Sequence, residues 1–375
     1  MGVIGTVAAF LAILVVLVLV HEIGHFIVAK RAGITVQEFG IGFPPRLASV
    51  MWRGTRYSIN AIPLGGFVKM LGEDGDVELN RLREEGLSEA EIAHAMKGAF
   101  NRKPIWARLG VLLAGVVMNF LLAAALFSVA LSLPQQVGYG PLTVVEIQEG
   151  SPAAAALRLD DVILEANGRS FERSGDLTRY VARHAGEQVV LTIERDGEQT
   201  EVTVVPRELT EEQIAEGVGP IGFGWRPERV VEEPSPVESP IEAVSEGFRA
   251  TVTVAVQIPG GLADAVGGLL GFNPDAADDA RGPIGIAQET GRVLESALVN
   301  QLFFVGLLSI NLAVLNVLPF PPLDGGRIAV VLVEAVRRRR LPAEREALIY
   351  LTGLAILLAL VVLISIQDIQ RLFGG

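Results

Sequence analysis

Four long apolar segments alternate with polar stretches along this chain, over residues 3–28, 109–133, 297–318 and 347–366. Each segment is long enough to cross the hydrocarbon core of a bilayer as a helix, which takes about 20 residues. The first segment has no charged side chain before His21. The pattern predicts a polytopic α-helical membrane protein with four transmembrane helices.

A cleaved signal peptide is the alternative interpretation of the first segment. It fits less well, because no basic residue precedes the apolar run and the run is longer than the apolar region of a typical signal peptide. We therefore interpret the segment as the first transmembrane helix.

Composition supports the membrane assignment and limits the chemistry. Half of the 375 residues are apolar, and the mean hydropathy of +0.44 is too high for an ordinary soluble domain. The chain contains no cysteine, which excludes a disulfide framework, a cysteine nucleophile and cysteine metal ligands. Any metal site must therefore use His, Asp or Glu.

The charges divide the chain unevenly. Residues 134–295 carry 28 acidic and 12 basic side chains, a net charge of −16, so the rest of the −12 chain carries +4. Basic residues near the ends of transmembrane helices mark the cytoplasmic side, and here they are Lys30, Arg31, Arg102, Lys103, Arg108 and Arg337–Arg340. We therefore expect residues 31–108 and 319–346 to be cytoplasmic, with residues 134–295 and both termini outside. This distribution gives no support for binding of nucleic acid.

The outer stretch contains a compact α+β module. Short runs rich in β-branched residues predict strands over 142–147, 161–168, 188–197 and 198–207, and short helices are predicted over 151–159 and 174–186. The dipeptide Asp196-Gly197 is a hairpin signal between the last two strands. The Pro- and Glu-rich tract 231–240 predicts a linker, and residues 271–282 predict a flexible loop.

Two histidines and a glutamate lie at the end of the first apolar segment, in the stretch VLVHEIGHFI. His21 and His25 are four residues apart and so share one face of a helix. Two imidazoles at this spacing can hold one Zn²⁺ with Glu22 beside a bound water, and H-E-x-x-H on a helix is a signature of zinc proteases. Gly24 lets a neighbouring backbone approach closely. A chance polar cluster at the membrane interface is the alternative, but ionisable residues within a membrane are usually functional.

A catalytic zinc commonly has three protein ligands and a water, so a third ligand must come from elsewhere. Asp324 is the only acidic residue between Glu295 and Glu334, and it lies in NVLPFPPLDGGR at the inner end of the third apolar segment. Backbone interrupted by prolines at membrane depth is tolerated only where protein or a wet cavity satisfies it. Asp324 is therefore the preferred third ligand, and an ordinary helix-terminating turn is the alternative. The remaining histidines, His94 and His184, lie in soluble segments.

The paired motifs HEIGH and NVLPFPPLDGG resemble the site-2 protease family of intramembrane zinc metalloproteases. Further stretches resemble its bacterial RseP-like (regulator of sigma-E protease) branch: EFGIGFPPRL (38–47), YSINAIPLGGFVKMLGE (57–73), FNRKPIWARLGVLLAG (100–115) and GPIGIAQ (282–288). The resemblance covers nearly the whole chain, and the paired motifs are highly specific.

The resemblance implies roles for individual residues. It implies that His21, His25 and Asp324 are the zinc ligands and that Glu22 is the general base. Asn316 matches an asparagine that positions the substrate backbone. The stretch IPLGGF (62–67) matches a re-entrant β-hairpin loop that pairs with an unwound substrate, with Gly65 and Gly66 as substrate-binding positions; a hairpin lying wholly in the cytoplasm is the alternative.

Two features depart from the family pattern. The second apolar segment reads AGVVMNF (114–120), with Val116 where the family often has proline, although Asn119 is retained. The outer stretch contains one β-rich module, whereas some relatives carry two. Neither departure touches a proposed metal ligand.

The outer module resembles a PDZ domain over residues 144–168. Its sequence has a strand, a Gly-Ser-Pro-Ala helix start and an Asp-Asp-Val-Ile strand in the family's order. Such domains bind chain termini or strands along a sheet edge, and the GYG stretch (138–140) is a candidate carboxylate-binding loop. A peptide-binding module and a folded spacer that excludes large substrates are equally compatible with this pattern.

The resemblance implies an intramembrane zinc metalloprotease of the bacterial inner (cell) membrane. Its expected substrates are transmembrane segments of single-pass membrane proteins, such as anti-sigma factors or signal-peptide remnants, cleaved in regulated intramembrane proteolysis. A non-enzymatic membrane scaffold and a metal transporter are the rival interpretations. A scaffold needs none of the four site residues, and a transporter needs ionisable residues that the centres of the second and fourth segments lack.

These inferences define a fold class: four transmembrane helices with a zinc site between helices 1 and 3, a re-entrant β-hairpin, and an extracytoplasmic α+β PDZ-like domain. The expected organisation is helix 1 with HEIGH at 1–30, the cytoplasmic and re-entrant region at 31–105, helix 2 at 106–133, the PDZ-like domain at 134–232, linker and amphipathic segments at 233–295, helix 3 at 296–318, the LDGG motif and basic loop at 319–346, and helix 4 at 347–368.

Overall fold

The computed structural model describes residues 2–73, 82–84, 86, 88–148, 150–207, 220–269, 282–339 and 341–373. The chain forms two compact units. Unit 1 comprises Met1–Ala130, Val244–Ile258 and Ala280–Gly375, and unit 2 comprises Leu131–Ala243 and Pro259–Asp279.

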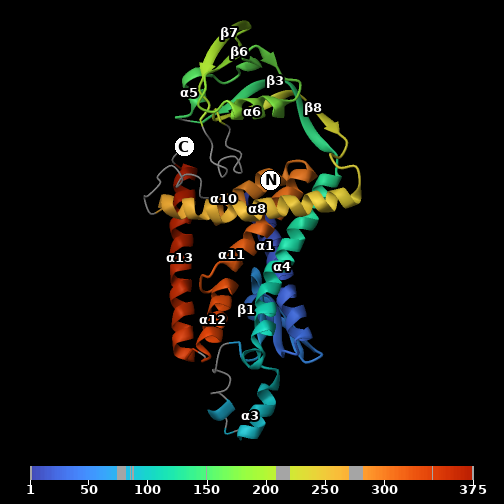
Figure 1. Ribbon diagram of the computed structural model, residues 1–375, viewed down its shortest axis with the longest axis vertical. Helices are drawn as coiled ribbons and strands as arrows, with labels where there is room; N and C mark the ends of the chain where they lie inside the picture. The colour runs from blue at the N-terminus through green and yellow to red at the C-terminus, as the bar shows by residue number, and fades with distance from the viewer. Residues whose placement is uncertain are drawn as a thin grey trace. The chain divides into compact units, whose positions relative to one another are not determined.

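Unit 1 is built on the four long apolar helices that the hydropathy pattern predicts. Over the described residues, four helices are long and apolar enough to cross a membrane: α1 (Val3–Arg31), α4 (Ile105–Ser132), α11 (Leu298–Val317) and α13 (Ala343–Phe373). Figure 1 shows α1, α4 and α11 running alongside one another. Before His21, helix α1 is apolar around its whole circumference, as expected of a helix surrounded by lipid and other apolar helices. The chain is a multi-pass membrane protein.

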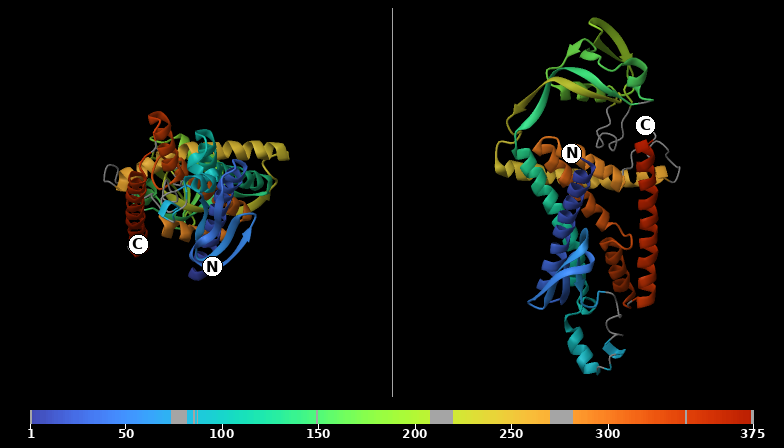
Figure 2. Two further views of the ribbon diagram at one scale, coloured as in Figure 1. Left: turned by 90° about the horizontal axis from the view of Figure 1, so that it is seen from below. Right: turned by 180° about the vertical axis from the view of Figure 1, so that it is seen from behind.

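A long β-hairpin follows α1. Strand β1 (Val36–Trp52) pairs antiparallel with β2 (Thr55–Met70), and several bulges interrupt the register. The hairpin packs along α1, as the two ribbon views show (Figure 2). A β-hairpin is present as predicted, but residues 62–67 lie within strand β2 and the hairpin turn is at Arg53 and Gly54. Its re-entry into the membrane stays a prediction.

A small helical segment joins the hairpin to α4. It contains α3 (Glu89–Ala95), which begins with a capping box between Ser88 and Glu91, and the 3-10 turns η1 (Met96–Gly98) and η2 (Phe100–Arg102). Its own apolar cluster consists of Leu71, Leu82, Ile92, Met96 and Ala99. His94 lies exposed on α3, as expected for a residue outside the metal site.

The segment predicted to contain linker and amphipathic residues is more ordered than expected. It contains α8 (Pro240–Leu269) and α10 (Pro283–Leu294). Helix α10 packs on α1 and α13, and Asp368 of α13 accepts hydrogen bonds from the backbone N–H groups of Gly282 and Gly285 at 3.1 and 2.9 Å. This carboxylate satisfies two of the donors that every helix leaves free at its start. Except for Gly282, the predicted loop 271–282 lies outside the described residues.

Helix α11 is followed by a tight turn and then by α12 (Asp324–Arg337). The turn contains the prolines of the PFPPLDGG sequence. A Cβ atom on Gly325 would lie 2.0 Å from the Leu318 carbonyl oxygen, and one on Gly326 would lie 2.8 Å from the Pro321 nitrogen. The two glycines are therefore required for the start of α12 to fold back against the end of α11.

Unit 2 contains a six-stranded antiparallel sheet with strand order β7-β6-β4-β3-β8, and β5 pairs with β4 at one side. The strands are β3 (Gln135–Ile147), β4 (Val162–Ala166), β5 (Arg169–Ser170), β6 (Val189–Arg195), β7 (Glu198–Val204) and β8 (Phe223–Glu233). Helices α5 (Pro152–Ala156) and α6 (Ser174–Arg183) pack against the sheet and complete its apolar core. The predicted α+β module is confirmed, and Asp196 and Gly197, both with positive φ, form the β6–β7 hairpin turn.

Two predictions for this module are wrong. The GYG stretch is not a free loop, because Gly138 and Tyr139 pair with Val230 and Arg229 of β8. The predicted linker begins too early, because β8 continues to Glu233, which pairs with Gln135. The first and last strands of the module therefore form a two-stranded ribbon where the sequence suggested irregular chain.

Candidate metal centre

Three side chains from two distant segments converge in unit 1. His21 Nε2 lies 2.8 Å from Asp324 Oδ2, His25 Nε2 lies 3.2 Å from the same oxygen, and the two Nε2 atoms are 3.0 Å apart. His21 and His25 are 5% and 6% exposed. The structure thus brings together the three residues that the sequence analysis selects as ligands.

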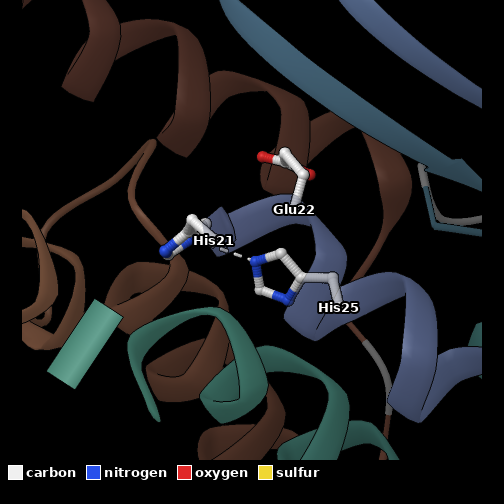
Figure 3. A group of neighbouring side chains, drawn as sticks. All are labelled: His21, Glu22 and His25. Carbon is white, nitrogen blue, oxygen red and sulfur yellow. Dashed lines mark hydrogen bonds between the residues drawn. The ribbon is translucent and has the colours of Figure 1, made fainter. Parts of the chain in front are cut away.

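Helix geometry explains how α1 presents its part of the cluster. Residues four apart lie one turn apart on the same face. Figure 3 shows the His21 and His25 rings next to each other while Glu22 projects to a different side, and the two ring planes are nearly perpendicular, at 78°. Helix α1 comes close to α4 at this level, because a Cβ atom on Gly24 would lie 2.4 Å from the Ala114 carbonyl oxygen. The expected close approach at Gly24 is confirmed.

Asp324 owes its position to the turn after α11. It is the first residue of α12, where the free N–H groups of the helix favour a carboxylate. The proline- and glycine-containing turn holds this helix start against the end of α11, so the carboxylate reaches the α1 imidazoles.

The chemistry of the cluster fits a bound cation. His25 Nδ1 lies 2.7 Å from the Val111 carbonyl oxygen, which accepts its proton, so His25 Nε2 carries a lone pair. That lone pair faces another imidazole nitrogen and a carboxylate oxygen within 3.2 Å. Bonds of about 2.0–2.1 Å to a tetrahedral zinc place its N and O ligands about 3.3 Å apart. The spacing of the three atoms is therefore close to that of a zinc ligand set.

The neighbouring helix leaves room for an ion at this point. A Cβ atom on Gly115 of α4 would lie 2.5 Å from His21 Nε2 and 2.6 Å from His25 Nε2. Any other residue at position 115 would place a side chain against both ligand atoms. The bare glycine thus keeps open a space that borders the two imidazole nitrogens.

Glu22 lies beside this set. The potential ligand atoms of His21, Glu22 and His25 are within 4.8 Å of one another. The alternative set of three metal ligands therefore comes from α1 alone. Asp324 is the better third ligand, because its oxygen is within 3.2 Å of both Nε2 atoms. This choice leaves the Glu22 carboxylate free for proton transfer.

Gly65 and Gly66 bring β2 against the same part of α1. A Cβ atom on Gly65 would lie 3.1 Å from Val18 Cγ1, and one on Gly66 would lie 3.8 Å from Glu22 Cγ. Among the described residues, β2 pairs only with β1. Residues 66–70 of β2 pair on one side with residues 36–41 of β1. The other backbone edge of this segment has no strand partner among the described residues, and it begins at Gly66, close to Glu22.

Asn316 differs from the other predicted site residues, because its hydrogen bond is made within its own helix. It lies near the end of α11, and its amide nitrogen donates to the Leu312 carbonyl oxygen of its own helix at 3.0 Å. Its predicted role in positioning substrate stays a prediction.

The structure also places residues at the site that the sequence analysis did not select. Asn119 of α4 is fully buried, with Nδ2 3.3 Å from His21 Nδ1. Glu73, which follows β2, forms an ion pair with Arg327, three residues after Asp324. Glu73 lies within the stretch 57–73 that carries the family resemblance, and Asn119 is the asparagine retained in the departing stretch AGVVMNF. Their partners come from distant segments and leave no local signal in the sequence.

The chain matches Peptidase family M50 over residues 9–360. The four apolar helices and the cluster of two histidines and one aspartate are typical of a membrane zinc metalloprotease. The chain belongs to Peptidase family M50. It is a zinc metalloprotease, which confirms the predicted enzyme class and cofactor.

Curated relatives are similar over nearly their whole lengths. Zinc metalloprotease RasP of Geobacillus kaustophilus is 30% identical, with 98% of each chain covered. Regulator of sigma-W protease RasP of Bacillus subtilis is 30% identical, with 99% of each chain covered. Metalloprotease MmpA of Caulobacter vibrioides is 32% identical, covering 97% of this chain and 95% of the relative.

Solved structures similar to part of the chain include PDZ domains of two SdrC-like proteins. The one from Listeria monocytogenes is 20% identical and covers 23% of this chain and 88% of that domain, with a TM-score of 0.21. The one from Listeria innocua is 22% identical and covers 24% of this chain and 94% of that domain, with a TM-score of 0.20.

Proposed function

We propose that this chain is an intramembrane protease that hydrolyses peptide bonds within transmembrane segments of single-pass membrane proteins. The observation that supports it is the convergence of His21, His25 and Asp324 on one point between α1 and the start of α12, at the end of an apolar helix. A group of metal-binding side chains on a helix that is long and apolar enough to span a membrane favours a substrate that also lies in the membrane.

In this proposal the three ligands are His21, His25 and Asp324. When bound, zinc supplies Lewis-acid activation of water and of the scissile carbonyl group. The Glu22 carboxylate accepts a proton from the attacking water and returns it to the nitrogen of the leaving amine. Glu22 suits this role because it lies beside the ligand atoms without being the closest oxygen to them.

The β-hairpin provides a way to hold an unwound substrate. A transmembrane helix hides its carbonyl groups in i→i+4 hydrogen bonds, and exposed backbone in lipid is costly unless it finds partners. The edge of β2 at Gly65 and Gly66 can pair with an extended substrate strand next to Glu22. Asn316, near the end of α11, is the proposed side-chain partner of the substrate backbone.

We place the protein in the bacterial inner membrane, with the basic loops in the cytoplasm and the sheet module outside. The distribution of lysine and arginine supports this orientation. The name of one relative, a regulator of sigma-W protease, favours membrane-anchored anti-sigma factors as a substrate class. Remnants of signal peptides are a second class of single-pass substrate.

The sheet module is proposed to be a PDZ-like domain that binds chain ends or strands. It contains a pocket lined by apolar residues, among them Leu177 and Val181 of α6 and Phe223 and Trp225 of β8. An apolar pocket beside a helix and a strand favours peptide binding over a spacer function.

Cleavage of a purified single-pass substrate in liposomes tests the proposal. The wild type and Glu22→Gln are compared for cleavage and for zinc content, with Glu89→Gln on the exposed helix α3 as the matched control. We expect all three to hold zinc and only Glu22→Gln to lose cleavage. Cleavage by Glu22→Gln at the wild-type rate contradicts the general-base role. Cuts that map only outside the apolar segment of the substrate contradict the intramembrane assignment.

Labelling of introduced cysteines tests the orientation, and the chain has no cysteine of its own to interfere. Glu187→Cys lies in the sheet module and Glu89→Cys lies on α3, and both side chains are exposed. We expect a membrane-impermeant maleimide to label Glu187→Cys in intact spheroplasts and Glu89→Cys only after lysis. The reverse pattern overturns the proposed orientation.

A further inference from the structure

Helix α4 lines one side of the metal centre with three positions spaced four residues apart. They are Val111, Gly115 and Asn119, which lie on one face of the helix. The Val111 carbonyl oxygen contacts His25 Nδ1 at 2.7 Å, Gly115 faces both Nε2 atoms, and the Asn119 amide contacts His21 Nδ1 at 3.3 Å. One face of α4 therefore contacts the Nδ1 atoms of both imidazoles and leaves a gap at Gly115, beside their Nε2 atoms.

The two contacts from α4 reach chemically equivalent atoms. A histidine that binds a metal through Nε2 carries a proton on Nδ1, and that proton needs an acceptor, which fixes the ring's tautomer and orientation. For His25 the acceptor is the Val111 carbonyl oxygen. For His21, the group that contacts Nδ1 within the described part of the chain is the amide of Asn119.

The orientation of an asparagine amide is assigned from its hydrogen bonds, because its oxygen and nitrogen have nearly the same shape. With Nδ2 toward His21, Asn119 Oδ1 is buried and has no hydrogen-bond partner among the described residues. Turning the amide by 180° therefore breaks no bond made by that oxygen. It presents Oδ1 to His21 Nδ1, which a metal-bearing His21 requires.

We propose that Asn119 is a positioning residue of the metal centre, whose side-chain oxygen accepts the Nδ1 proton of His21 and so directs His21 Nε2 toward the ion. This inference rests on the proposed assignment of His21, His25 and Asp324 as ligands. The backbone of Asn119 is held in place separately, because Ser309 Oγ of α11 donates to its carbonyl oxygen at 2.8 Å. The side chain is thus available for His21 while the backbone connects α4 to α11.

The test is the zinc affinity of full-length variants in detergent, measured by competition with a chromophoric chelator. Asn119→Leu keeps the shape of the side chain without its oxygen, and we expect its zinc dissociation constant to rise about 10- to 100-fold, as for other partners of metal-binding histidines. Asn119→Asp keeps an acceptor and removes the donor, and we expect its affinity to stay within about threefold of wild type. Ser309→Ala is the control for packing and should leave zinc affinity unchanged.

The pair of variants separates the inference from its rivals. If the amide donates to His21 instead, Asn119→Asp will lose zinc as severely as Asn119→Leu, which overturns the proposal. If Asn119 matters only for packing, Asn119→Leu will keep wild-type zinc affinity, or will lose it only together with a lower unfolding temperature that Ser309→Ala shares. Failure of the wild type itself to bind zinc contradicts the ligand assignment rather than the role of Asn119.

The cobalt-substituted protein provides an independent readout. The visible d–d bands of Co²⁺ depend on ligand number and geometry, so a reoriented His21 should shift or weaken them in Asn119→Leu and not in Asn119→Asp. Identical spectra for the wild type and Asn119→Leu at saturating Co²⁺ contradict a positioning role.

Discussion

Asp161 of unit 2 and Asp324 of unit 1 are both largely removed from water, but their partners differ. Asp161 is 1% exposed and accepts hydrogen bonds from Arg195 Nε at 2.8 Å, Arg195 Nη2 at 2.7 Å and the Arg158 N–H at 2.7 Å. Asp324 contacts two imidazoles that belong to α1. The charge and the hydrogen-bond acceptors of Asp161 are compensated by donors of the chain itself. Asp324 instead adds negative charge next to imidazole nitrogens, which are themselves electron-pair donors.

Asp161 has the surroundings of a structural aspartate, and Asp324 has those expected of a metal ligand. A buried carboxylate with a bidentate arginine and a backbone donor has its lone pairs and charge compensated, and loss of one partner is costly for stability. A carboxylate grouped with imidazole lone pairs is compensated fully only by a cation. We therefore expect substitutions around Asp161 to change stability, and substitutions around Asp324 to change metal binding.

The largest expected effect comes from filling the space at the metal centre. Gly115→Ala places a methyl group 2.5 Å from His21 Nε2 and 2.6 Å from His25 Nε2, in the space next to both nitrogens. The zinc content should therefore fall from about one ion per chain to close to none. Gly110→Ala on the same helix is the matched control, because its Cβ would meet only Val28 Cγ1 at 3.9 Å. Elemental analysis of both purified variants makes the comparison. Full zinc in Gly115→Ala would show that the cluster does not hold the ion.

Removal of the charge at position 161 should weaken unit 2 and leave zinc in place. Asp161→Asn leaves Arg195 without its anionic partner, and we expect it to destabilise the module by about 3 kcal/mol. Asp160→Asn is the control, because Asp160 is the exposed neighbour and asparagine tolerates its positive φ. Denaturant unfolding followed by the fluorescence of Trp225, with Trp52 and Trp106 replaced by phenylalanine, reports on this module. Equal stability of the two variants would contradict the structural role of Asp161.

The same aspartate predicts how the module responds to acid. Burial alone would raise the pKa of Asp161, but hydrogen bonds from Arg195 and from the Arg158 N–H outweigh burial and hold the pKa below its usual value. Its stabilising contribution is therefore complete above the unfolded-state pKa of about 3.9 and is lost as the pH falls through that value toward the folded-state pKa. The Trp225 signal should show a steeper loss of stability below about pH 4 in the wild type than in Asp161→Asn. Parallel curves for the two proteins would contradict this assignment.

A smaller effect is expected at the ion pair that joins the end of β2 to α12. Glu73→Gln removes the charge opposite Arg327, and a partly exposed pair contributes up to about 1 kcal/mol, which corresponds to about fivefold in rate. We expect cleavage to fall by up to that factor with zinc retained, because Arg327 and Asp324 share the first turn of α12. Glu89→Gln, which removes the charge from the exposed Arg83–Glu89 pair, should have no effect. Loss of zinc in Glu73→Gln would show that the pair holds the ligand itself in place.

The sequence predicts those parts of the molecule that depend on local periodicity. The four spanning helices follow from apolar runs, and His21 and His25 follow from their spacing on one helix. Asp324 can be predicted as the third ligand because it is the only acidic residue between Glu295 and Glu334. The orienting contacts of Asn119 and the space at Gly115 depend on how α4 is rotated against α1, which no local pattern specifies.

The two errors in unit 2 have the same origin. Residues 229–233 and 135–139 lack a strong strand pattern of their own, and each becomes a strand because it pairs with the other. Glycine at 138 and the acidic tract near 232 suggest irregular chain when they are considered alone. Pairing between segments about 90 residues apart is tertiary information.

The proposed function requires that Asp324 binds the zinc and that a buried aspartate elsewhere, such as Asp161, does not. Zinc per chain should be measured for the wild type, Asp324→Ala and Asp161→Asn after purification under identical conditions, with Trp225 unfolding recorded for each. We expect about one zinc in the wild type and in Asp161→Asn, and strongly reduced zinc with unchanged Trp225 unfolding in Asp324→Ala. Stoichiometric zinc in Asp324→Ala would contradict the proposed function.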